Sequence, residues 1–117
     1  MTIRVAINQP YLFPYRGFFD LIASVDKFVV YDDAKYSKGY WINRNTFPEL
    51  FTFRLKKSSD YSKINERFFL NIGEDKKKFK NRFPDLKADK YLNLLDQKKN
   101  IAVNITRVLK AMCNDFG

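Results

Sequence analysis

The fold is decided by a stretch that begins with the apolar run Ile3-Arg4-Val5-Ala6-Ile7 and continues into the polar cluster Asn8-Gln9-Pro10. Residues 15–25 follow with apolar side chains at helical spacing, and Phe28-Val29-Val30-Tyr31 then leads into Asp32-Asp33. The order of strand, polar turn, helix, strand and polar turn is typical of a βαβ unit with parallel strands. The short and almost continuous apolar run at residues 3–7 predicts a strand that is buried on both faces of a sheet.

Both polar clusters are expected at the carboxyl ends of neighbouring strands, where ligands bind in open α/β sheets. Asp32 or Asp33 can act as a general base if its pKa is raised, and Asp33 can hold Mg²⁺ together with phosphate oxygens. Asn8 and Gln9 offer amides for a substrate hydroxyl or carbonyl. The structural alternatives are an aspartate that caps the next turn and amides that satisfy backbone groups near Pro10. The functional interpretation makes Asn8, Asp32 and Asp33 catalytic and Gln9 substrate-binding.

Residues 34–48 have no clear period, and a loop of this length is uncommon unless it is functional. Arg44 can clamp a phosphate or carboxylate, although an ordinary surface salt bridge is the alternative. Tyr36, Tyr40 and Trp41 can stack on a base or sugar ring, although packing under the loop is the alternative, which we favour for Trp41. The predicted substrate-binding residues are Gln9, Lys35, Tyr36, Asn43, Arg44 and Asn45, with Arg16 and Lys38 as further candidates for a basic pocket.

The second half of the chain predicts two short strands and three helices. The strands are expected at residues 50–55 and 68–72, and the helices at 74–82, 87–95 and 101–116. The last helix has the most regular apolar face, so Cys113 on that face is interpreted as a packing residue. The expected fold is α/β, with a small mainly parallel sheet, packed helices, a βαβ start and a helical C-terminal part.

Composition restricts the possible chemistry. The chain has 117 residues, a formal net charge of +9, no histidine and a single cysteine. Without histidine, Ser-His and Cys-His catalysis are excluded, and a single cysteine excludes an intramolecular disulfide, which favours a reducing cytoplasm. The length predicts one domain over residues 1–117, with the motifs in 1–57 and a short strand and helices in 58–117. The positive charge favours anionic partners, although an AT-rich genome also produces many lysines.

Three runs in the first half of the chain form a pattern: VAINQPYLFPYRGFF at residues 5–19, DKFVVYDDAKY at 26–36 and YWINRN at 40–45. In this order and spacing, they resemble the signature of the WbqC-like protein family. The resemblance is strong over residues 3–57 and continues loosely through 63–65 and the last helix. The signature positions that it implies are Asn8, Gln9, Asp32, Asp33, Asn43, Arg44 and Asn45.

This resemblance implies a bacterial transferase of surface-polysaccharide biosynthesis of the O-antigen type. The implied substrate is a sugar nucleotide or another anionic metabolite, the implied modification is addition of an amino acid, and Mg²⁺ is a candidate cofactor. Family members usually carry histidine at the position of Asn8, so an aspartate would replace it as the base. They are also longer, so we expect a shortened member, in which an unpaired sheet edge or apolar face favours a homodimer.

Alternative functions remain open at this point. The basic helix at residues 74–82 and the aromatic residues of the loop also suit a nucleic-acid-binding module, whose affinity would fall steeply with salt. The order of elements is similar to that of nucleotidyltransferases with a His-x-Gly-His motif, although this chain lacks the histidines. A catalytically inactive remnant is the last alternative. No apolar run approaches the roughly 20 residues of a membrane-spanning helix.

Overall fold

A computed structural model describes residues 2–14, 16–37, 42–46, 49–86 and 88–116. The mixture of short strands and helices confirms the predicted α/β class. No helix in these ranges is long and apolar enough to cross a membrane. The elements are β1 (Val5–Asn8), α1 (Arg16–Ala23), β2 (Lys27–Val30), β3 (Arg44–Thr46), β4 (Leu50–Thr52), the 3₁₀ helix η1 (Ile64–Glu66), α2 (Ile72–Arg82), α3 (Asp89–Leu92) and α4 (Ile101–Phe116).

The predicted βαβ start is confirmed. β1 and β2 pair in parallel, with Val5 opposite Lys27 and Asn8 opposite Val30, and α1 connects them. The N–H of Tyr31 donates to the carbonyl oxygen of Asn8 at 2.8 Å, so the pairing continues one residue beyond β2. The two polar clusters therefore lie at the same edge of the sheet, as predicted.

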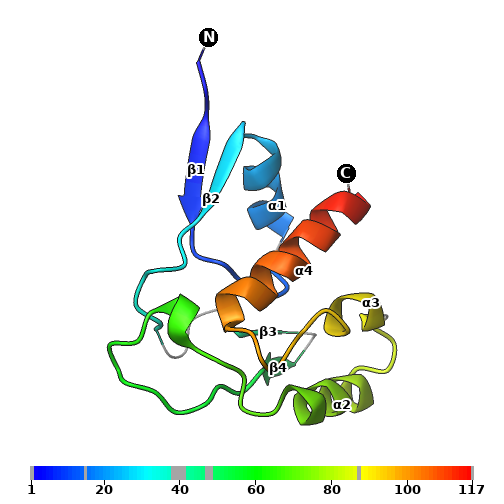
Figure 1. The fold of residues 1–117 in the computed structure, drawn as a ribbon. Helices are drawn as coiled ribbons and strands as arrows, with labels where there is room; N and C mark the ends of the chain where they lie inside the picture. The colour runs from blue at the N-terminus through cyan, green and yellow to red at the C-terminus, as the bar shows by residue number, and fades with distance from the viewer. Residues whose placement is uncertain (1, 15, 38–41, 47–48, 87, 117) are drawn as a thin grey trace.

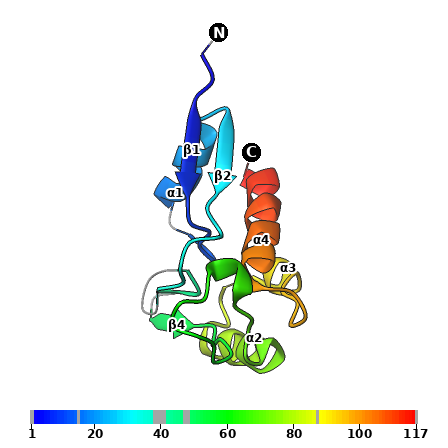
Figure 2. The same ribbon diagram turned by 60° about the vertical axis from the view of Figure 1, so that its left-hand side comes forward.

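The expectation that the first strand, β1, is buried on both faces is wrong. Phe28 packs on Phe18 of α1 with ring centroids 5.4 Å apart, and α1 and α4 lie on the same side of the strands (Figures 1 and 2). The alternate side chains of Val5, Ile7 and Val29 remain 52%, 63% and 45% exposed. An apolar run predicts a strand, but it does not show whether a second layer covers its other face.

A second, antiparallel pair forms between β3 and β4, with Asn45 opposite Phe51. The prediction for residues 50–55 is confirmed in its first half, whereas β3 was missed because its residues show no apolar alternation. The strand predicted at 68–72 is wrong. Phe69 forms an isolated bridge with Leu55, and the Asn71 side chain accepts a hydrogen bond from the N–H of Glu74 at 3.1 Å. That cap starts α2 at Ile72 instead.

Aromatic rings join this second sheet to α2, and α4 links the two halves of the molecule. The ring centroid of Phe79 on α2 lies 5.2 Å from that of Phe51 and 5.7 Å from that of Phe53. The predicted last helix is confirmed, while the helix expected at 87–95 is reduced to the single turn of α3. The buried apolar residues of α4 are Ile101, Ala102, Ile105, Val108 and Leu109.

Candidate functional site

The hydrogen bonds at the ends of β1 and β2 involve backbone groups. The Asn8 side chain accepts a hydrogen bond from the N–H of Gln9 at 2.8 Å, which is the structural alternative considered for it. Asp32 is half-buried and Asp33 is exposed. The carbonyl oxygen of Asp32 accepts a hydrogen bond from the N–H of Asn65 at 2.9 Å. Catalytic roles for Asn8, Asp32 and Asp33 stay a prediction.

The segment after β2 is held by hydrogen bonds to η1 and to the residues that precede η1. The carbonyl oxygen of Ala34 accepts from the N–H of Ile64 at 2.8 Å, and the N–H of Tyr36 donates to the carbonyl oxygen of Ser62 at 2.9 Å. These bonds continue the contact that Asp32 makes with Asn65. They direct residues 32–36 away from the sheet, so that Lys35 and Tyr36 reach a separate pocket.

That pocket has a volume of about 950 Å³. Its walls come from residues 35–37, from β3 and β4 with the residues that follow β4, from the loop at 57–60 and from Arg67. The volume falls within the roughly 300–1,000 Å³ that is typical of ligand pockets. Four of the residues predicted to bind substrate line this pocket: Lys35, Tyr36, Asn43 and Arg44.

The lining of the pocket is strongly cationic. Among the described residues that line it, Asp60 is the one carboxylate. Guanidinium groups match the geometry of phosphate and carboxylate, and a concave surface with charges of one sign attracts ions of the other. The pocket therefore suits an anionic ligand. Its cationic side chains are Lys35, Arg44, Arg54, Lys57 and Arg67.

Tyr36 is held in place from several sides. Its hydroxyl donates to the Asn43 side-chain oxygen at 2.8 Å, and the Arg67 guanidinium lies over its ring, 4.6 Å from the centroid. Burial raises the pKa of the Tyr36 phenol, while the charge of Arg67, the bond to Asn43 and the charge of Arg44 act in the opposite direction. At neutral pH the phenol therefore keeps its proton and can donate a hydrogen bond.

Asn43 acts mainly as a support for this wall. Its side chain is almost fully buried, and its amide nitrogen donates to the carbonyl oxygen of Phe53 at 2.6 Å. Its side-chain oxygen accepts the Tyr36 hydroxyl. Both ends of the amide therefore contact protein groups, so Asn43 positions Tyr36 at the edge of the pocket.

Arg54 is anchored to α2. Its Nε donates to Asp75 Oδ1 at 2.9 Å, its Nη2 lies 2.8 Å from the same oxygen and 3.3 Å from Glu74 Oε1, and its backbone N–H donates to Asp75 Oδ2 at 2.9 Å. The bond to Asp75 and the charge of that carboxylate raise the pKa of Arg54. Because acidic groups of α2 balance Arg54, this residue adds little to the attraction for an anion.

Among the described residues that were predicted to bind substrate, Asn45 and Gln9 do not line the pocket. The Asn45 amide nitrogen donates to the carbonyl oxygen of Phe13 at 2.7 Å, and its oxygen accepts from the N–H of Thr46 at 2.8 Å. Phe13 has φ of 52°, in the left-handed region that non-glycine residues rarely adopt, so Asn45 stabilises a strained turn. Gln9 lies at the end of β1. Lys38, Tyr40, Trp41 and the side chain of Arg16 lie outside the described residues.

The described part of the chain contains no group of three or more cysteine, aspartate or glutamate side chains that could hold a metal ion. The assignment of Asp33 to Mg²⁺ therefore stays a prediction. Such an ion would need most of its oxygen ligands from substrate phosphates and water.

Sequence reasoning missed part of the pocket lining. Lys57 belongs to a short basic run, Lys56-Lys57, that directly follows the strand predicted at residues 50–55. Arg67 lies in a segment without a recognisable motif. Only the overall positive charge indicated such residues. The missed charged residues are Arg54, Lys57, Asp60 and Arg67.

Comparison with known proteins places this chain in a family. The uncharacterized protein Rv1507c of Mycobacterium tuberculosis (strain ATCC 25618 / H37Rv) is 57% identical over 42 residues, which are 36% of this chain and 18% of that protein. No solved structure matches the chain. The model of the WbqC-like protein family matches residues 9–112. A match over most of the sequence shows that the chain belongs to the WbqC-like protein family.

Proposed function

We propose that this protein is a transferase of bacterial surface-polysaccharide biosynthesis, and that the pocket binds the phosphate-bearing part of its sugar substrate. The cluster of cations in the pocket is the observation that supports this proposal. The pocket has more positive charge, from Lys35, Arg44, Lys57 and Arg67, than Asp60 can neutralise. Such an excess suits a ligand group with two or more negative charges. The group transferred to the sugar is, in this proposal, an amino acid.

The proposed reaction uses both polar regions. Arginine and lysine side chains around a phosphate hold the substrate and stabilise negative charge that develops on it during transfer. Asp32 or Asp33 is the proposed general base. Since Asp33 is two residues from Lys35 in the chain, their Cα atoms lie within about 7 Å of each other. The end of β2 therefore lies next to the pocket. In open α/β sheets, ligands bind just beyond the carboxyl ends of parallel strands, so this arrangement supports the proposal.

Isothermal titration with inorganic pyrophosphate and with a sugar 1-phosphate tests the proposal, with and without Mg²⁺. We expect both ligands to bind and Lys57→Ala to weaken binding several-fold, because it removes one cation from the pocket. Lys77→Ala is the matched control, since Lys77 is an exposed lysine of α2 outside the pocket. Absence of binding, or equal losses in both variants, would contradict the proposal.

A short single-stranded nucleic acid in the same titration covers the alternative of a basic binding module. Binding that falls steeply with salt, and that Lys57→Ala and Lys77→Ala weaken equally, would favour a nucleic-acid partner on the broad basic surface. The transferase proposal predicts that the pocket variant alone affects its small anionic ligands.

A further inference from the structure

Tyr61 is an exposed aromatic residue beside the pocket. Its side chain is 83% exposed, the largest value among the described large apolar side chains that face solvent. The Nζ atom of Lys35, which lines the pocket, lies 5.2 Å from the centre of the Tyr61 ring. A flat ring at the border of an anion-binding pocket offers a stacking surface for a ligand that carries both charge and an aromatic ring.

The loop that carries Tyr61 has a defined internal structure. The hydroxyls of Ser58 and Ser62 lie 2.5 Å apart, the N–H of Tyr61 donates to the Ser59 hydroxyl at 3.2 Å, and the N–H of Ser62 donates to the Ser59 carbonyl oxygen at 3.0 Å. The backbone of Ser62 also contacts Tyr36, so the loop is tied to the wall of the pocket. Tyr61 is therefore presented from a turn that has its own hydrogen bonds.

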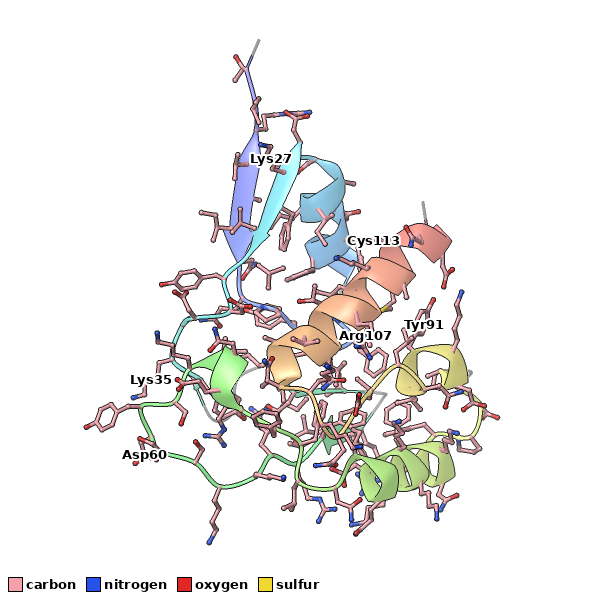
Figure 3. The ribbon with its side chains drawn as sticks, in the orientation of Figure 1. Lys27, Lys35, Asp60, Tyr91, Arg107 and Cys113 are labelled. Carbon is pink, nitrogen blue, oxygen red and sulfur yellow. The ribbon has the colours of Figure 1, made fainter. Side chains whose placement is uncertain are left out.

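Asp60 supplies a different kind of contact. It lines the pocket, and Figure 3 shows Asp60 and Lys35 on the same side of the molecule. A carboxylate repels phosphate, but it accepts hydrogen bonds from neighbouring hydroxyl groups, such as the two adjacent hydroxyls of a ribose. The pocket thus has cations for phosphates, an acceptor for hydroxyls and, next to both, an aromatic ring.

We propose that the pocket and Tyr61 together form a nucleoside diphosphate site. Lys35, Arg44, Lys57 and Arg67 hold the diphosphate, Asp60 accepts hydrogen bonds from the ribose, and the Tyr61 ring stacks on the base. This inference rests on the proposed function and specifies its substrate class as a nucleoside diphosphate conjugate. Stacking tolerates different bases, since each has a π-face.

Isothermal titration that compares UDP and ADP with inorganic pyrophosphate separates the nucleoside from the phosphates. We expect both nucleotides to bind the wild-type protein about tenfold more tightly than pyrophosphate, a typical gain from one stacked base. Tyr61→Ala should remove most of this advantage and leave pyrophosphate affinity unchanged, while Tyr61→Phe should retain it. Tyr31→Ala is the matched control, because Tyr31 is an exposed tyrosine just after β2. Asp60→Asn should weaken nucleotides relative to pyrophosphate.

The outcomes separate this inference from the proposed function. Equal affinity for UDP, ADP and pyrophosphate, unchanged in Tyr61→Ala, would overturn the nucleoside site and leave the anion pocket intact. Equal losses of nucleotide affinity in Tyr61→Ala and Tyr31→Ala would also overturn it. Failure of all these ligands to bind would overturn both proposals. Since Tyr61 is so exposed, its removal leaves the core intact, and circular dichroism checks the fold of each variant.

Discussion

The two polar regions of this molecule differ in how their side chains are used. At the ends of β1 and β2, the side chain of Asn8 contacts an adjacent backbone group, and Asp33 faces solvent. In the pocket, cationic side chains from four separate segments of the chain surround one volume. The first region is assembled from neighbours in a βαβ unit, whereas the second exists only after distant segments have packed together.

A motif near a strand end therefore indicates in which region of the fold a site lies, but it does not determine which residues form that site. The signature residues Asn43 and Arg44 do meet at the pocket, together with Lys35 and Tyr36. Two further signature residues, Asn8 and Asn45, stabilise the turns beside it. The segments that follow the strands thus supply the charge of the pocket.

The largest expected effect is on stability, where the comparison is between two aspartates. Asp75→Asn breaks the ion pair between a buried carboxylate and Arg54, which lines the pocket. We expect the free energy of unfolding to fall by about 3 kcal/mol. This value is at the low end of the range for breaking a buried ion pair, because the Arg54 side chain is 40% exposed. Asp33→Asn, the same change at an exposed residue, should cost less than about 0.5 kcal/mol. Urea unfolding measures both, and equal losses would contradict this account.

The next effect concerns ligand affinity. Arg67→Gln removes a guanidinium from the pocket, so we expect pyrophosphate affinity to fall about tenfold, as loss of a charged hydrogen bond predicts. Asp33→Asn should leave this affinity unchanged within about threefold, since Asp33 is not among the residues that line the pocket. Isothermal titration of both variants gives the comparison. A larger loss in Asp33→Asn would place the anion at the strand end.

A smaller effect is expected at Asn8. Asn8→Ala leaves the N–H of Gln9 without its present acceptor, so the free energy of unfolding should fall by about 1 kcal/mol. Pyrophosphate affinity should be unchanged, because this side chain supports a turn. Thermal unfolding and titration test the two halves of this prediction. A tenfold loss of affinity without a loss of stability would give Asn8 a direct role in binding.

The smallest effect is a dependence on pH. Burial raises the pKa of Tyr36 in the folded state. The contribution of the protonated phenol to stability is therefore complete below the pKa of the unfolded state, about 10, and is lost as pH rises through the folded-state pKa. Urea unfolding between about pH 8 and pH 11 should therefore show a steeper loss of stability in the wild-type protein than in Tyr36→Phe. Identical slopes would show that Tyr36 ionises equally in both states.

Much of the fold could be predicted from sequence. Apolar runs and helical spacing located β1, α1, β2 and α4, because these elements depend on local pattern. β3 was missed and the strand at 68–72 was wrong, since pairing and the Asn71 cap decide those segments. Exposure of Ile7 could not be predicted either, because it depends on which elements cover the sheet.

The candidate site was predictable only where residues lie within a recognisable motif. Arg44 is a signature position and Lys35 lies within one of the runs that resemble the family, so the sequence predicts both as candidates. Arg67 reaches the pocket because residues 32–36 contact η1, which directly precedes Arg67. Lys57 reaches it from the loop that precedes η1. These are tertiary contacts, and no periodicity or spacing in the sequence encodes them.

We claim that the pocket, and not the strand-end cluster, holds the anionic ligand. Titration of the ¹⁵N-labelled protein with pyrophosphate, followed by NMR of the backbone amides, tests it most directly. We predict saturable shifts at Lys35, Arg44, Lys57 and Arg67, with smaller shifts at Gln9 and Asp33. Shifts concentrated at Gln9 and Asp33, with the pocket unaffected, would contradict the claim.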